Sequence, residues 1–315
     1  MKKLKVIVSA LLVVVSIFAF TACGTFDGNF KEEATEEQLT QIKTAAGSSY
    51  SEKIEEEDGH GWIYKLKVED KTTANGKTET NKMNGNVQIG TNADGKLELA
   101  MKLSANAGGK KFNIETYRKD GDIYLKVGDG MGKFSPASSA IGGALGIDLD
   151  LSMYDKMIEG LTQLCGPMYI GMYADKVAAL TVEGSASLEA AGIKAYVDNS
   201  GDTFKIKYAF NTDAIKDSIQ EKDLKFNGNA TMDVIVVFNK DLSELKGIQF
   251  EIKYDCEYTD GDGVKTTSKS KLVASVEANA KAVKFPNLSK YGDLNGEQIG
   301  KMFDSITELM SGDNQ

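Results

Sequence analysis

The sequence offers few side chains that could carry out catalysis. His60 is the only histidine and lies in a polar acidic segment, residues 57–61. A histidine-dependent catalytic triad would have to use it, but an exposed loop histidine is the simpler interpretation. One histidine with Cys165 and Cys256 lacks the ligand spacing of a zinc site. We therefore expect no enzymatic activity, no metal and no cofactor.

Acidic turns are frequent enough to raise the question of calcium. Asp198 and Asp202 flank Ser200, and Asp260 lies two residues before Asp262. Neither segment has the central glycine and the distal glutamate of the EF-hand loop, and hairpin turns select Asp, Asn and Gly for backbone reasons alone. The glycines of residues 128–132 lack the Gly-Lys-Ser/Thr ending of a phosphate-binding loop. Nothing marks any two carboxylates as a glycosidase pair.

The beginning of the chain has the layout of a secretory signal peptide. Residues 1–5 contain three lysines, and fifteen uncharged residues follow from Val6 to Phe20. That run is shorter than the ~20 residues of a membrane-spanning helix. We therefore expect residues 1–22 to be removed during export.

Cys23 is the residue whose chemistry is best defined. The segment Phe20-Thr21-Ala22-Cys23-Gly24 resembles the lipobox of bacterial lipoproteins, although leucine is usual where Phe20 stands. In that family the cysteine thiol receives a diacylglyceryl group, and a peptidase then cuts before it. The resemblance implies that Cys23 anchors the chain at the extracytoplasmic face of the cell membrane, because two acyl chains anchor stably. The alternative is a secreted soluble protein with a cysteine at the cut by chance.

The charge of the chain argues against nucleic-acid binding. The chain has 37 basic and 46 acidic residues, and the first 22 residues hold three of the lysines and no acid. The mature region would therefore have a net charge of −12. Such a surface gives no steering towards phosphates. The two remaining cysteines, Cys165 and Cys256, could form a disulfide in an exported protein, but two buried free thiols are favoured because no cysteine-dense framework exists.

The pattern of apolar residues predicts strands on both sides of a helical region. Residues 31–43 have weak helical character, and strict alternation begins at Trp62. Residues 128–146 are rich in Gly, Ser and Ala and are expected to form an irregular loop. A helical insert near residues 150–180 precedes more strands, and the chain ends in an amphipathic helix. The expected strands lie near residues 62–68, 83–89, 97–103, 112–116, 123–127, 193–197, 204–210, 232–238, 248–258 and 272–278.

This order of elements predicts an α+β fold, with a largely antiparallel curved sheet and helices packed on one face. We expect residues 23–47 to be the lipidated cysteine, a tether and a short helix. Residues 48–315 would then form a single domain. The layout resembles the LolA/LppX-type lipoproteins. In those proteins an antiparallel half-barrel and its helices enclose an apolar space for acyl chains, so the resemblance implies a similar fold and ligand here.

Methionines gather in the predicted helical insert. Flexible, polarisable methionine side chains suit adaptable apolar surfaces, so the insert could line a ligand pocket, or it could simply pack on the sheet. The candidate pocket residues are Met153, Tyr154, Met157, Met168, Tyr169 and Met172.

The sequence thus predicts a membrane-anchored extracytoplasmic lipoprotein that binds a hydrophobic or amphiphilic ligand such as lipid. The alternative is a non-catalytic envelope interaction or structural protein.

Overall fold

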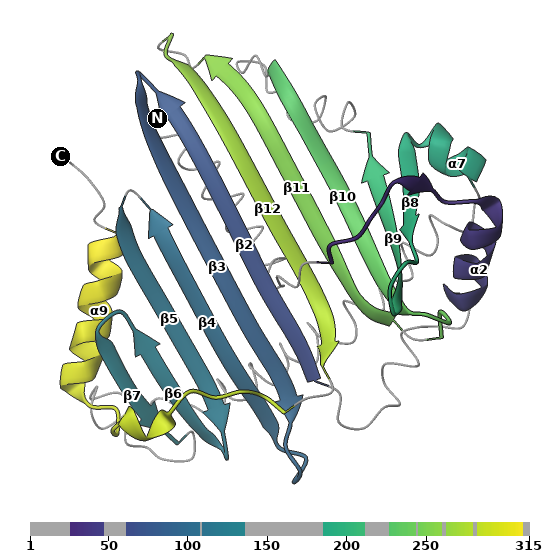
Figure 1. Ribbon diagram of the computed structural model, residues 1–315. Helices are drawn as coiled ribbons and strands as arrows, with labels where there is room; N and C mark the ends of the chain where they lie inside the picture. Colours follow the sequence, from purple (N-terminus) through teal and green to yellow (C-terminus); the bar gives the residue numbers. More distant parts are fainter. Residues whose placement is uncertain are drawn as a thin grey trace.

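The protein is built around one large antiparallel sheet (Figure 1). The computed structural model describes residues 26–46, 61–107, 109–135, 185–211, 227–243, 245–259, 263–279 and 282–310. They form twelve strands in the order β1-β8-β9-β10-β11-β12-β2-β3-β4-β5-β6-β7. Because the first and last strands of this order do not pair with each other, the sheet is open.

Six consecutive strands form one half of the sheet. They are β2 (Gly61–Ala74), β3 (Lys77–Thr91), β4 (Leu97–Ala107), β5 (Lys110–Lys119), β6 (Asp122–Val127) and β7 (Gly130–Phe134). Two of the hairpins turn through two residues with positive φ, Asn75-Gly76 and Asp120-Gly121. Asn and Asp tolerate this conformation and Gly adopts it without strain, so these pairs set the register of the long strands.

The other half begins with the short edge strand β1 (Glu32–Glu33). It continues through β8 (Ile193–Asp198), β9 (Thr203–Phe210), β10 (Asn227–Asn239), β11 (Leu245–Thr259) and β12 (Lys265–Asn279). Strand β12 pairs with β2 from Thr266 to Asn279 and joins the two halves. The helices are α2 (Glu36–Ala46), α7 (Ser185–Ala190) and α9 (Gly296–Met310), and η2 (Leu288–Lys290) is a single 3₁₀ turn.

The predicted fold class is wrong. The antiparallel sheet is present, but the protein is mainly β rather than α+β, since the described residues contain only three short helices. The irregular loop expected at residues 128–146 is also partly wrong, because Gly130–Phe134 forms strand β7. The helical insert near 150–180 lies outside the described residues. None of the described helices has the length and apolar character needed to cross a membrane.

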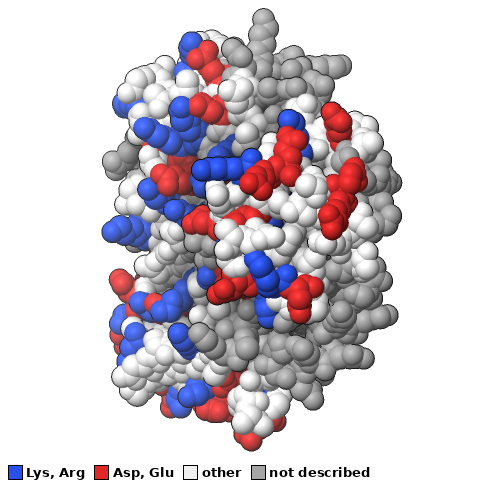
Figure 2. Space-filling view, turned by 45° about the vertical axis from the view of Figure 1, so that its right-hand side comes forward, with Lys and Arg blue, Asp and Glu red and all other residues white. Residues whose placement is uncertain are grey.

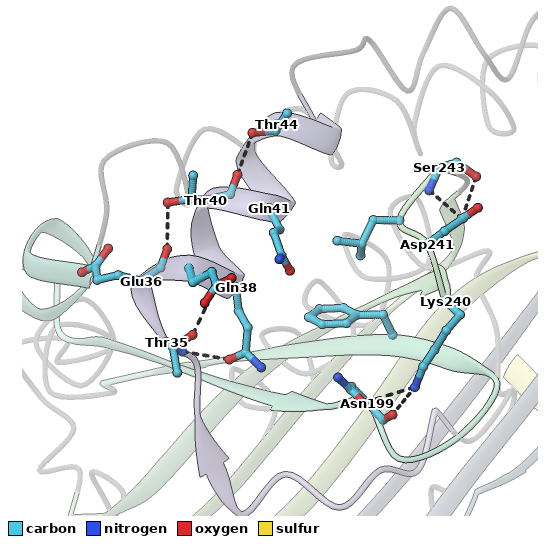
Figure 3. A pocket seen from close by; sticks show the side chains of 13 residues that line it. Thr35, Glu36, Gln38, Thr40, Gln41, Thr44, Asn199, Lys240, Asp241 and Ser243 are labelled. Atoms are coloured by element: carbon cyan, nitrogen blue, oxygen red, sulfur yellow. Dashed lines mark hydrogen bonds between the residues drawn. The ribbon is translucent and has the colours of Figure 1, made fainter.

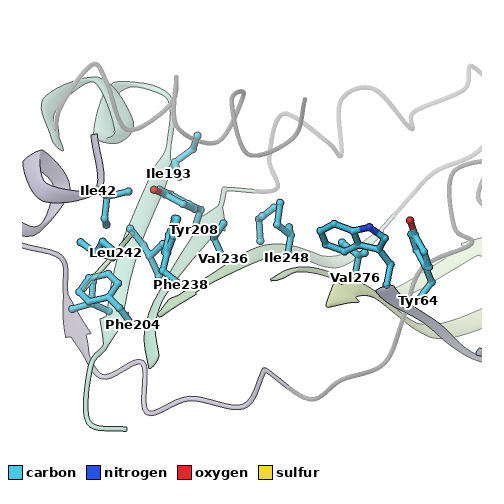
Figure 4. Packing of buried hydrophobic residues seen from close by; sticks show 14 of the residues in the cluster. Ile42, Tyr64, Ile193, Phe204, Tyr208, Val236, Phe238, Leu242, Ile248 and Val276 are labelled. Atoms are coloured by element: carbon cyan, nitrogen blue, oxygen red, sulfur yellow. The ribbon is translucent and has the colours of Figure 1, made fainter. Parts of the chain in front are cut away.

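The main core lies on one face of the sheet, here called the apolar face (Figure 4). Helices α2 and α7 cover this face at the β8–β9 end, where Leu39, Ile42 and Leu188 are buried with Ile206 and Tyr208. A capping box begins α2: the Thr35 hydroxyl accepts a hydrogen bond from Gln38 N, and the Gln38 side chain accepts one from Thr35 N. From α2 the core extends across the sheet, from strand to strand, as far as Leu99 in β4.

The C-terminal segment passes around the far edge of the sheet. Residues 282–291 lie on the opposite face, here called the charged face, where Tyr291 contacts Tyr117 and Tyr124. The segment then pairs with the edge strand, since Lys133 N donates to Gly292 O and Leu294 N donates to Lys133 O, both at 2.8 Å. After this crossing, α9 covers the apolar face at β5–β7 (Figure 1).

Candidate functional site

Three adjacent rows of apolar residues cross the apolar face from strand to strand. Paired residues in neighbouring strands point to the same side of the sheet, so the register defines each row. The first contains Ile206, Val236, Ile248, Val276, Tyr64, Val87 and Met101, and the second contains Tyr208, Val234, Phe250, Ala274, Leu66, Gly85, Leu103 and Ile114.

The third row, here called the apolar strip, differs from the others in its exposure. It consists of Phe210, Met232, Ile252, Leu272, Val68, Met83, Ala105 and Phe112. Ile252 is 37% exposed and the other seven are half-buried, whereas the first row is buried except at Met101 and half of the second row is buried. A row of apolar side chains that is less buried than the neighbouring rows is a candidate for a binding site.

Polar residues border the apolar strip on the same face. The next row is polar at Tyr254, Ser270 and Asp70. The Asp70 carboxylate accepts hydrogen bonds from Thr72 Oγ1 at 3.1 Å and from Ser268 Oγ at 3.3 Å. Burial raises the pKa of Tyr254, and the charge of Asp70 raises it further, while its hydrogen bond with Ser270 acts in the opposite direction. An apolar surface beside hydroxyl groups and a carboxylate is suited to an amphiphilic ligand.

The site residues predicted from the sequence lie outside the described part of the chain. These are Cys23 and the six candidate pocket residues Met153, Tyr154, Met157, Met168, Tyr169 and Met172. Both assignments therefore stay predictions. Sequence reasoning missed the apolar strip, although the alternation in β2, β3, β11 and β12 had already placed its members on one face.

A hollow lies beside α2 and is lined by both polar and apolar side chains, Phe204 and Leu242 among the latter (Figure 3). It is an open groove of about 1090 Å³ between this helix and the turns after β8 and β10. Its wall includes Gln38 and Gln41 from the helix and Lys240 from the opposite turn. Lys240 Nζ already donates to Asn199 Oδ1 at 3.1 Å and to Gly201 O at 2.9 Å, so this ammonium group holds the two turns together.

The acidic turn at Asp198 is used for structure. One oxygen of its carboxylate accepts from Ser200 Oγ at 2.6 Å and from Ser200 N at 3.0 Å, and the other accepts from Asn29 N at 2.8 Å. These hydrogen bonds lower its pKa to about 2. The structure describes no group of three or more potential ligands for a metal within the ranges given above. Asp260, Asp262 and His60 lie outside those ranges.

The structure shows one buried thiol. Cys256 is free and 7% exposed on the apolar face of β11. Burial, followed by the charge of Asp255, raises its pKa to about 11. Its thiol is therefore protonated near neutral pH and suited to packing rather than to nucleophilic attack. Cys165 lies outside the described residues.

Comparisons with known proteins give little further information. No family model matches the sequence, and no curated protein is significantly similar to it. The crystal structure of LprF from Mycobacterium bovis has a TM-score of 0.25 and 10% identity, over 81% of this chain and 99% of that chain. The ywiB protein from Bacillus subtilis has a TM-score of 0.15 and 8% identity, over 70% and 93%. A DUF1329 family protein from Desulfovibrio piger has a TM-score of 0.16 and 9% identity, over 75% and 92%. TM-scores this low establish neither a shared fold nor a shared function.

Proposed function

We propose that this protein is an extracytoplasmic lipoprotein, anchored in the cell membrane through Cys23, that binds a hydrophobic or amphiphilic ligand such as lipid. The anchoring rests on the resemblance of residues 20–24 to a lipobox. The ligand class rests on the apolar strip, which crosses eight strands and is bordered by Tyr254, Ser270 and Asp70. Acyl chains would lie along the strip, and a polar headgroup would lie beside the bordering row.

Ile252 is the best place to test ligand binding, because it is the most exposed member of the strip. In Ile252→Asn an amide replaces apolar surface that an acyl chain would cover. We expect binding of a fluorescent fatty acid to weaken about tenfold, which corresponds to ~1.4 kcal/mol. Ile63→Asn is the matched control, since Ile63 is half-buried on the charged face of β2.

The ligand itself can be sought in the same preparation. The full chain would be purified from membranes, and non-covalent lipid would be extracted with organic solvent and identified by mass spectrometry. Lipid recovered from the wild type and lost in Ile252→Asn would support the proposal. A chain that carries no extractable lipid, and whose two variants bind the fatty acid equally, would favour an envelope interaction protein instead.

A further inference from the structure

The middle of the charged face carries more basic than acidic side chains. The strip concerned, here called the lysine strip, lies on the four long strands β11, β12, β2 and β3, at the centre of the sheet. It holds eight lysines and five acidic residues, a net charge of +3 in a chain whose net charge is −9. Its members are Lys65, Lys67, Lys71, Lys82, Lys253, Lys265, Lys269, Lys271, Glu69, Glu251, Asp255, Glu257 and Glu277.

Ion pairs neutralise part of this strip and leave the lysines in excess. Every acidic member pairs with a lysine: Lys65 lies 3.0 Å from Glu277, for example, and Glu251 contacts both Lys253 and Lys271. Lys67 and Lys71 are exposed and have no ion-pair partner within the described part of the chain. In Figure 2 basic and acidic side chains stand intermixed over the described surface.

The two terminal segments cover the charged face on either side of the lysine strip. Residues 282–291 run from the end of β3, where Lys284 N donates to Gln88 Oε1 at 3.0 Å, across β4–β7, where Tyr291 packs on Tyr117. Near the other end, Phe26 is buried against Ile235 and Val237 of β10. Figure 1 shows both segments crossing the strands on the same side. The lysine strip remains exposed between them, since Lys253, Lys269 and Lys271 are each about half exposed or more.

The position of Phe26 limits where the anchor can be. Its ring lies on Gly247, where an added Cβ would be 2.6 Å from Phe26 Cζ, so Phe26 is fixed on the charged face. Cys23 precedes it by three residues, which span at most ~11 Å when fully extended. A lipid on Cys23 must therefore enter the membrane close to the charged face of β10 and β11.

We propose that the lysine strip docks on the anionic lipid headgroups of the membrane that holds the anchor, an inference that rests on the proposed lipidation of Cys23. Lysines near an anionic bilayer surface are attracted by roughly 1 kcal/mol each. The anchor removes the translational freedom that would otherwise oppose so weak a contact. In this orientation the apolar strip faces away from the membrane, towards the extracytoplasmic space.

The test measures which lysines the membrane protects. The mature chain, lipidated on Cys23, would be placed in vesicles of phosphatidylglycerol and phosphatidylcholine, or of phosphatidylcholine alone, and treated with an amine-acetylating reagent. We expect Lys67 and Lys71 to react about tenfold more slowly in the anionic vesicles, and this protection to disappear at high salt. Lys301 on α9, on the apolar face, should react equally in both.

Charge reversal supplies the second arm. In Lys67→Glu/Lys71→Glu, two of the six remaining strip lysines, Lys269 and Lys271, should lose their protection by the membrane. Lys77→Glu/Lys96→Glu makes the same charge change at exposed positions next to the turns that flank β3. In this control variant the strip lysines should stay protected.

The outcomes separate the two proposals. If the chain is lipidated but Lys67 and Lys71 react equally fast in vesicles with and without phosphatidylglycerol, the docking proposal is wrong and the anchoring proposal stands. Protection that survives the Lys67→Glu/Lys71→Glu change would also overturn the docking proposal. An intact mass without a diacylglyceryl group would overturn the anchoring and the docking together.

Discussion

Tyr117 has no exposed surface, and its hydroxyl donates a 2.5 Å hydrogen bond to Glu115. Tyr291, from the C-terminal segment, meets the ring of Tyr117 edge-on, with 6.1 Å between centroids. Burial raises the pKa of both phenols, and the charge of Glu115 raises both further; the pKa of Tyr291 reaches about 12. These two side chains therefore pack between the C-terminal segment and the sheet in their neutral forms, and ionisation of either would weaken this contact.

The first prediction concerns alkaline pH. The unfolded chain releases the proton of each tyrosine near pH 10, whereas the folded chain holds it to higher pH, so the contribution of the pair is complete below pH 10. We expect the free energy of unfolding to fall as the pH rises from about 10 towards 12. Urea unfolding at several pH values would measure it, and Tyr291→Phe should give a shallower fall. An equal fall in wild type and variant would show that these phenols are not the cause.

A second prediction at this scale concerns Cys256. Because it is buried and its pKa is raised to about 11, its thiol should not react with a disulfide reagent at pH 8 in the folded protein. In denaturant it should react at once. The absorbance of the released reagent would count the thiols that react fast, and the Cys256→Ala variant would show which of them is Cys256. Rapid reaction of Cys256 in the native state would contradict the buried position.

At the scale of elements, the packing of α9 and of Leu294 just before it depends on two glycines of β7. A Cβ added to Gly130 would lie 2.6 Å from Gln298 O and 2.8 Å from Met302 N, and one added to Gly132 would lie 2.8 Å from Leu294 Cα. The backbone of this segment therefore lies so close to β7 that only glycine, which has no side chain, fits at these two positions. Asn295 caps the helix through a 3.0 Å hydrogen bond from Gln298 N.

The third prediction follows from this close approach. Gly130→Ala should displace α9 and lower the free energy of unfolding by roughly 1–3 kcal/mol. The new methyl group would clash with Gln298 O and Met302 N, which are backbone atoms and cannot move aside as a side chain could. Hydrogen exchange of the α9 amides and urea unfolding would detect both effects. Gly201→Ala is the control, because nothing lies within 4 Å of a Cβ added at that position. Equal effects of the two substitutions would contradict the packing.

These elements also show what the sequence could and could not predict. Alternation identified the strands around Trp62, Leu99 and Phe250, because a sheet with one buried face imposes a period of two. It could not identify β7, because two of its three apolar-face positions are Gly130 and Gly132, which leave Phe134 alone and no alternation to read. The C-terminal helix was predicted, yet Phe303 of its apolar stripe is 62% exposed, because the sheet beneath accommodates only the side around Met302.

At the scale of the whole molecule, the sheet is two meanders joined at one seam. Strands β2–β7 follow one another in sequence, and so do β8–β12, whereas the β12–β2 seam pairs Ala274 with Leu66. No local pattern marks such a pairing. The sequence therefore predicted an antiparallel sheet but not its strand order, and the exposure of the apolar strip, which depends on that order, was beyond reach for the same reason.

The fourth prediction concerns the order of folding. Closing the seam orders the chain between two distant strands, while a hairpin such as β2–β3 orders only a short turn. We expect amides that bond across the seam to become protected after those of the β2–β3 hairpin. Pulse-labelling hydrogen exchange during refolding would measure both. Seam amides that gain protection first would mean that long-range contacts nucleate the sheet.

The ends of the open sheet have a consequence for crowded copies of the protein. An unpaired edge of a sheet can recruit a strand from another chain and so begin aggregation. Here one outermost strand, Glu32–Glu33, is two acidic residues long, and the other is bridged by the chain's own backbone at Lys133. At its two outermost strands the described sheet thus offers neighbouring molecules in one plane no long free edge to join, which favours separate molecules at high surface density.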